Sequence, residues 1–166
     1  MLVNYIDVLT TYYPNVAAHA HGAGYEYSEI NWISGAPLPS QAELDAKALD
    51  LARERVWKAI QVERDRRKAG GYKVGTNWFH SDDASRIQQL GLVMMGANLP
   101  AGIMWKTLGG SFVPMTPTLA QQIFMTTAMS DQAIFAVAEQ HKIAMFQVAI
   151  PNTYDYTVGW PKTYGE

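Results

Sequence analysis

The clearest periodic pattern in the chain is an amphipathic helix over residues 41–68. Its apolar positions fall on one helical face, and charged residues occupy the other faces. The apolar face comprises Leu44, Ala48, Leu49, Ala52, Val56, Ala59 and Ile60. Ser40 and Glu43 have the spacing of a capping box, and the glycine pair at 70–71 is typical of a helix end. The pattern predicts one long helix between these signals.

Shorter patterns after residue 70 predict two β-hairpins and two more helices. The first hairpin joins "YKV" to "NWF" through Gly75–Thr76, and the second joins "IMWKT" to "SFVPM" through "LGG". A helix is expected from about Asp83 to Met95. The last helical region runs from Thr118 to about Ala149, and Ser130–Asp131 either decorates it or breaks it in two. This order of elements predicts the α+β class, with long helices and two short hairpins.

The first 40 residues have another composition, rich in Gly, Pro, Tyr and Ala, with short aromatic runs between turn signals. We expect an extended arm with one or two short strands, lying on its own domain or on a partner. The sequence thus predicts three parts. They are an extended aromatic arm over 1–40, a helix-hairpin-helix-hairpin-helix domain over 41–150, and an aromatic, turn-rich tail over 151–166.

The last helical region is apolar on nearly every side, and residues 107–130 carry no charge. A helix that is apolar all round needs cover on every side, which a small domain supplies on only one or two. We therefore expect a partner protein or a second copy to cover the remainder. The alternative is that the hairpins and the arm wrap this helix completely.

Composition narrows the functional classes further. The 166 residues have a net charge of −2 and no cysteine, so disulfides, thiolate metal sites and cysteine nucleophiles are excluded. Acidic and basic residues alternate along the first long helix, which predicts a solvated face without a nucleic-acid stripe. No run is apolar and long enough for a membrane span, and the start lacks the basic region of a signal peptide. We expect no nucleic-acid or membrane partner and no cofactor.

The stretch "WFHSDDASR" at 78–86 is the best candidate for catalysis. A hydrolase would use His80 as base, Ser81 as nucleophile and an aspartate as orienting group. Adjacent strand residues point to opposite faces, however, so His80 and Ser81 should diverge. Helix capping explains the same residues, with Ser81 or Asp82 as the N-cap and Asp82 spaced to pair with Arg86. We therefore predict a structural junction and no catalytic residues.

His19 and His21 form a second candidate site. At i and i+2 in an extended segment their imidazoles lie on the same side, where they could bind zinc, copper or iron. One chain offers no further ligand nearby, whereas a trimer would supply six imidazole nitrogens around its axis. Two histidines on a polar loop are the simpler interpretation.

Several short motifs along the chain together resemble a known family. They are Tyr13–Pro14, the "INW" run at 30–32, "PSQAELDA" at 39–46, the junction from Val74 to Asp82, "WKTLGG" with "PMTP", and "YDYTVGWP". The chain resembles small proteins or terminal domains of unknown function from tailed bacteriophages and prophages, encoded near tail-fibre and baseplate genes.

The resemblance implies a non-enzymatic virion protein of the tail-fibre or baseplate region, assembled in the host cytoplasm. Its partners would be other tail proteins and itself, with a trimer favoured. Two alternatives stay open: a tail-fibre assembly chaperone that leaves before the particle is complete, and a small hydrolase centred on His80. Because large aromatic residues dominate interface energetics, a set of them is expected to contact partners. These are Tyr13, Tyr25, Tyr27, Trp32, Phe135, Phe146 and Trp160.

Overall fold

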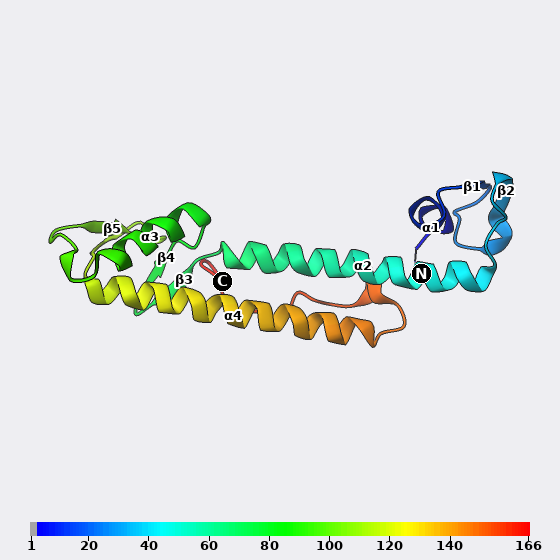
Figure 1. Cartoon of the computed structure of the whole chain (residues 1–166). Coiled ribbons are helices and arrows are strands. Elements are labelled where there is room, and N and C mark those ends of the chain that lie inside the picture. The colour runs from blue at the N-terminus through cyan, green and yellow to red at the C-terminus, as the bar shows by residue number, and fades with distance from the viewer. Residues whose placement is uncertain (1–2) are drawn as a thin grey trace. The chain divides into compact units, whose positions relative to one another are not determined.

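The chain folds into four α-helices and three two-stranded antiparallel sheets within residues 3–166, the part described by this computed structural model (Figure 1). The helices are α1 (Tyr5–Tyr12), α2 (Gln41–Lys68), α3 (Asp83–Met95) and α4 (Pro117–Phe146). The sheets pair β1 (Val16–Ala20) with β2 (Ile30–Gly35), β3 (Tyr72–Val74) with β4 (Asn77–Phe79), and β5 (Met104–Lys106) with β6 (Phe112–Pro114). Single 3₁₀ turns lie at Tyr27–Glu29, Gly96–Asn98 and Pro151–Thr153. The α+β class is confirmed.

The contacts divide the chain into two compact units. Unit 1 contains the residues up to Ile60 and His141–Tyr156, and unit 2 contains Gln61–Gln140 and Thr157–Glu166. Helices α2 and α4 each contribute to both units. The boundaries expected from composition lie after residues 40 and 150 and differ from the limits of these units. The composition of the chain shifts at the ends of helices, whereas the limits of a compact unit depend on which residues pack together.

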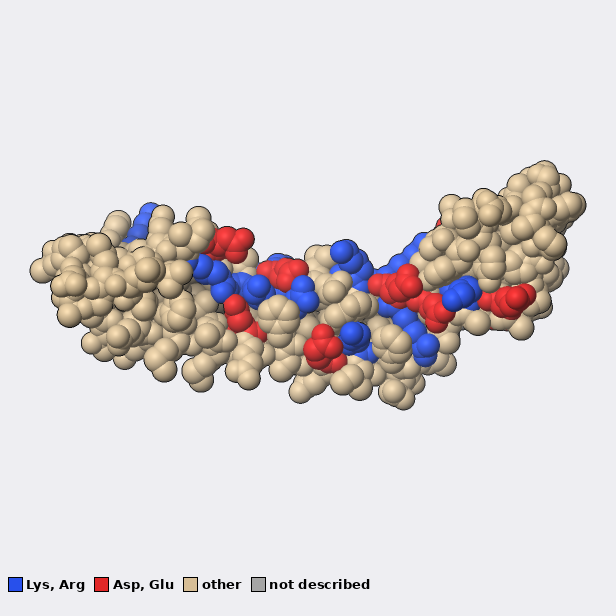
Figure 2. All heavy atoms as spheres, in the orientation of Figure 1, with Lys and Arg blue, Asp and Glu red and all other residues tan. Residues whose placement is uncertain are grey.

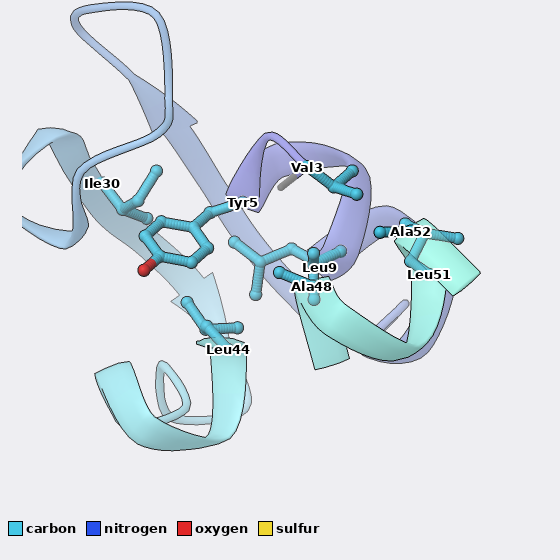
Figure 3. Packing of buried hydrophobic residues seen from close by; sticks show 9 residues of the cluster. Val3, Tyr5, Leu9, Ile30, Leu44, Ala48, Leu51 and Ala52 are labelled. Atoms are coloured by element: carbon cyan, nitrogen blue, oxygen red, sulfur yellow. The ribbon is translucent and has the colours of Figure 1, made fainter. Parts of the chain in front are cut away.

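The prediction of an extended arm was wrong for residues 5–12, which form helix α1 of unit 1. Asn4 caps α1, its side-chain oxygen accepting the Ile6 N–H at 2.7 Å. Tyr5, Val8 and Leu9 lie on one face of α1, and they pack with Ile30 of β2 in a core completed by α2 (Figure 3). The remaining members of this buried cluster are Val3, Leu44, Ala48, Leu51 and Ala52. The first 40 residues therefore bury apolar surface within the chain.

Helix α2 begins and ends where the sequence predicts. The Ser40 N–H and hydroxyl donate to the Glu43 carboxylate at 2.8 and 2.6 Å, and the Glu43 N–H donates back to the Ser40 hydroxyl at 3.4 Å. These hydrogen bonds lower the pKa of Glu43. Most of the predicted apolar face is buried, but Leu49 and Ala59 are only half-buried, and Leu51 is buried instead.

The core of unit 2 lies between the two hairpins and α4. Tyr72, Phe79, Met115, Ala120 and Ile123 are buried together, and the Tyr72 and Phe79 rings stack across the β3–β4 pair. Both hairpins and the limits of α3 agree with the sequence prediction.

Helix α4 is continuous, so Ser130–Asp131 does not break it. In unit 2 its buried residues form a single narrow stripe of Ala120, Ile123, Thr127, Ile134 and Ala138. No helix within residues 3–166 has the length and hydropathy needed to cross a bilayer.

The final segment closes over the end of α2 inside unit 2. The Tyr164 N–H donates to the carbonyl of Gly70 at 2.9 Å, and its ring packs edge-on against Trp78. Arg67 donates to the carbonyl of Pro161 at 3.0 Å and pairs with the Glu166 carboxylate at 3.2 Å. These contacts fix the last ten residues to the end of α2.

Candidate interaction surfaces

The Ser81 hydroxyl links the end of α2 to the start of α3. It donates to the carbonyl of Lys68 at 2.6 Å and accepts the Gly71 N–H at 2.8 Å. Both partners are backbone groups, and Ser81 is buried. A hydroxyl held in this way has no geometry for nucleophilic attack, so its role is to satisfy polar groups at a helix terminus.

Arg86 extends the same junction. It donates to the carbonyls of Ser81 and Lys68 at 2.5 and 3.1 Å, and it forms a bidentate ion pair with Asp131 of α4 at 2.7 and 2.9 Å. The carboxylate raises the pKa of the Arg86 guanidinium. The prediction that Arg86 pairs with Asp82 at i,i+4 was wrong. The Arg86 guanidinium donates instead to two backbone carbonyls and to Asp131, which lies 45 positions later in the sequence.

Asp82 is the N-cap of α3, as one of the two capping interpretations predicted. Its carboxylate accepts the Ser85 hydroxyl at 2.7 Å and the Ser85 N–H at 3.0 Å, and these bonds lower the pKa of Asp82. The carbonyl of His80 accepts from buried Gln89, which also accepts the Tyr72 hydroxyl at 2.6 Å. The sequence pattern did not identify Gln89, because nothing in the pattern separates it from its exposed neighbour Gln88.

Two cavities border this junction. One of about 470 Å³ is lined by Asp65, Lys68, Ala69, Ser81, Asp82, Asp83 and Arg86. Another of about 270 Å³ is lined by His80, Ser85, Gln88, Met104, Trp105 and Lys106. In the first, Asp82 caps α3, Arg86 is paired with Asp131 and Asp65 is paired with Arg64, which explains the presence of these three groups without a reaction.

His19 of β1 and His21, which follows this strand, lie on the same side of the chain, as expected. The side-chain nitrogen of Asn31, across the hairpin on β2, lies 2.8 Å from Nδ1 of His21 and 3.4 Å from Nε2 of His19. In the described part of the chain, no group of three or more His, Asp or Glu side chains is placed to share a metal ion. A metal at the pair would need ligands from another molecule.

The aromatic residues of the first 40 positions divide into two groups. Tyr13 and Tyr27 pack against the core of unit 1, and the Tyr27 hydroxyl donates to the carbonyl of Pro39 at 2.9 Å. Tyr25 and Trp32 are exposed, and Trp32 retains 51% of its surface although its Nε1–H donates to the carbonyl of Ala36. Only the second group offers a large apolar surface to a partner.

The three aromatic residues expected near the end of the chain each lie beneath a cation. Within unit 2, the Phe135 ring lies 4.8 Å from the Arg64 guanidinium, and within unit 1 the Phe146 ring lies 4.9 Å from that of Arg53. Both phenylalanines remain partly exposed. Trp160 is only 9% exposed and lies against Arg67, so its surface is already used inside the chain.

An uncharged apolar surface on unit 2 includes the last helix, where the sequence predicted one, and extends over α3 and the β5–β6 hairpin, where it did not. Figure 2 shows charged atoms gathered over α2, whereas the part of this face formed by α3 and β5 is nearly all uncharged. From Ile87 to Ser130 the only charged residue is Lys106. The large exposed apolar side chains in this range are Ile87, Leu90, Met94, Met95, Met104, Phe112, Phe124, Met125 and Met129. Helix periodicity marked these residues as apolar but gave no means to separate the buried from the exposed ones.

Comparisons with known proteins identify a family. Residues 51–158, which are 108 of the 166, match the family described as Domain of unknown function (DUF4376). No curated protein and no solved structure matches the chain. The matched range contains the capped junction, both later hairpins and α4. The chain therefore belongs to the DUF4376 family.

Proposed function

We propose that the chain is a non-enzymatic structural protein of a bacteriophage virion, in the tail-fibre or baseplate region, which acts through protein–protein contacts. The main support is the amount of exposed apolar surface on both units, combined with a candidate catalytic stretch in which Ser81 and Asp82 are engaged at the ends of helices. The family has no assigned function, so the phage context rests on the sequence resemblance.

The exposed aromatic residues of unit 1 are the proposed contacts with other tail proteins. Trp32 lies on β2 of the exposed β1–β2 hairpin, and Tyr25 lies in the loop before it. Tryptophan and tyrosine are enriched among the residues that carry most of an interface's binding energy. Self-association, with a trimer favoured, is part of the same proposal, and the protein would be assembled in the host cytoplasm.

Mass spectrometry of purified particles from the encoding phage or induced prophage tests this role. Peptides of the chain at a stoichiometry matching another tail protein are expected. If they are absent from particles but copurify with fibre protein from infected cells, the assembly chaperone becomes the better assignment.

A substitution at Trp32 tests the proposed surface. Losing a central tryptophan typically costs a complex about 2 kcal/mol, or roughly thirtyfold in affinity. The Trp32→Ala variant should therefore be depleted from particles. Val62→Ala is the matched control, because Val62 is a similarly exposed apolar residue that lies on α2, outside the proposed surface. Equal incorporation of the two variants would remove Trp32 from the interface.

A further inference from the structure

Helix α4 carries a second heptad-spaced stripe on the face opposite its buried one. We call it the outer stripe, and it comprises Gln122, Met125, Met129, Gln132 and Ala136. All five residues are exposed, with Met125 at 63% and Met129 at 68%. Spacings of three and four residues keep such positions on one side of a helix, as at the seam of a coiled coil.

The outer stripe is long enough for a helix-to-helix contact. The part of α4 in unit 2, residues 117–140, rises about 36 Å at 1.5 Å per residue. The outer stripe itself covers residues 122–136 of this part, which is just over two heptads and rises about 21 Å. The exposed apolar residues of α3 span less than two heptads, from Ile87 to Met95. The stripe on α4 is therefore the better candidate of the two.

The charge pattern of this face fits a copy of itself. Residues 117–130 of α4 contain no charged residue, and Asp131 is paired with Arg86. In a two-fold symmetric contact the residues near the axis lie close to their own copies, so a like charge at the centre of the stripe would repel its counterpart. An uncharged stripe avoids this repulsion.

The polar members of the stripe are also self-complementary. A glutamine amide both donates and accepts hydrogen bonds, so Gln122 and Gln132 can each pair with the same residue type on another chain. A partner of strong charge would find no counter-charge there. Ala136, and Ala128 beside Met125 and Met129, are both exposed and leave room for two helix backbones to approach.

We infer that the outer stripe of α4 packs against the outer stripe of a second copy of this chain. Met125 and Met129 fill the centre of the contact, with Gln122 and Gln132 to either side along the helix. This inference rests on the self-association in the proposed function and assigns it a surface. Its test uses the isolated protein, so a monomer would remove the self-association, whereas the virion role is decided by the mass spectrometry of particles.

Light scattering coupled to size exclusion, over loading concentrations from about 1 to about 100 μM, tests the inference on the full chain. At least twice the mass of one chain is expected in the upper part of this range. Met129→Glu places like charges across the contact and should raise the dissociation constant by a factor of about 100 or more. Met94→Glu is the matched control, because Met94 is 79% exposed on α3 and lies outside the stripe.

The result expected is that Met129→Glu yields a monomer with unchanged circular dichroism, while Met94→Glu keeps the mass of the native protein. A native chain that is monomeric throughout the range would overturn the inference. So would an oligomer that survives Met129→Glu, or a monomer that binds a different tail protein through the stripe.

A cross-linking experiment gives independent evidence. The chain contains no cysteine, so a single introduced thiol reports only its own surroundings. Oxidised Met129→Cys, or Met125→Cys if the helices are offset, should form a covalent pair, because a disulfide requires Cβ atoms about 4 Å apart. Met94→Cys should not. Equal cross-linking of all three variants would indicate random collision and contradict the contact.

Discussion

Replacing Arg86 by methionine would remove the side chain that joins three segments of unit 2. The guanidinium contacts the end of α2 through the carbonyl of Lys68, the start of α3 through that of Ser81, and α4 through Asp131. Methionine retains most of the aliphatic volume but donates nothing. The substitution therefore leaves two carbonyls and one carboxylate without this donor.

The cost follows from the burial of the ion pair. Removing one partner of a buried ion pair costs about 3–5 kcal/mol, whereas an exposed pair is worth less than about 1 kcal/mol. The side chains of Arg86 and Asp131 are 23% and 25% exposed, so we take the lower end of the buried range, about 3 kcal/mol. For a chain of this size that corresponds to a fall in melting temperature of about 6–12 °C.

Equilibrium urea unfolding of four proteins at neutral pH measures this cost. The native chain, Arg86→Met, Asp131→Leu and the double variant form a cycle, and its coupling free energy should be about 1–2 kcal/mol. Lys47→Met serves as the surface control, because Lys47 pairs with Asp50 at 3.2 Å and both side chains are more than 40% exposed. It should change the free energy of unfolding by less than about 0.5 kcal/mol.

Two results would refute this reasoning. Arg86→Met could cost no more than the surface control, or the coupling free energy could be indistinguishable from zero. Either would mean that the junction is held by the packing around it and that these hydrogen bonds add little.

Three further predictions concern other parts of unit 2. In denaturant titrations Gly71→Ala should lower the free energy of unfolding by about 2 kcal/mol more than Gly75→Ala. Both glycines have positive φ, but only a Cβ added at Gly71 would meet other atoms, the nearest at 2.3 Å. Phe79→Ala should cost about 3–5 kcal/mol in the same assay because the ring is fully buried, whereas Phe112→Ala at an exposed position should cost less than about 1 kcal/mol. Hydrogen bonds from arginines of α2 lower the pKa of Glu63 from 4.5 to about 2. The ionised Glu63 therefore stabilises the fold by about 1–2 kcal/mol after screening. This stabilisation is complete above about pH 4.5 and is lost as the pH falls toward 2. In Glu63→Gln this segment of the stability–pH curve should be flatter, and an unchanged slope would contradict the assignment.

Local signals in the sequence predicted those parts of the fold that neighbouring residues determine. The Ser40 capping box, the glycine pair at the end of α2 and the Asp82 cap each act over a few positions, and each lies where it was expected. Helix α1 was missed because its aromatic and β-branched residues resemble a strand, although Tyr5, Val8, Leu9 and Tyr12 have helical spacing. That spacing becomes decisive only once α2 is present to bury it.

The pattern of apolar and polar residues could not predict contacts between distant segments of the chain. Arg86 was expected to pair with a residue four positions away, and the sequence alone gave no reason to prefer Asp131. Likewise, the periodicity that marked α4 as apolar did not separate its two stripes, because both repeat at the same spacing and differ only in what the rest of the fold covers. Trp160 was counted as a contact residue for the same reason, since its cover by Arg67 depends on a segment more than 90 residues away.

The closure of the final segment over α2 has a consequence for which fragments can be expressed as stable proteins. The family match ends at residue 158, before Pro161, Tyr164 and Glu166, which bind Arg67 and Gly70. It also starts ten residues after α2 begins. A fragment trimmed to residues 51–158 would lose the Ser40 cap and leave the polar groups at the end of α2 open to solvent. A fragment that keeps residues 3–40, which cover and cap the start of α2, together with residues 161–166 keeps both ends of the helix satisfied.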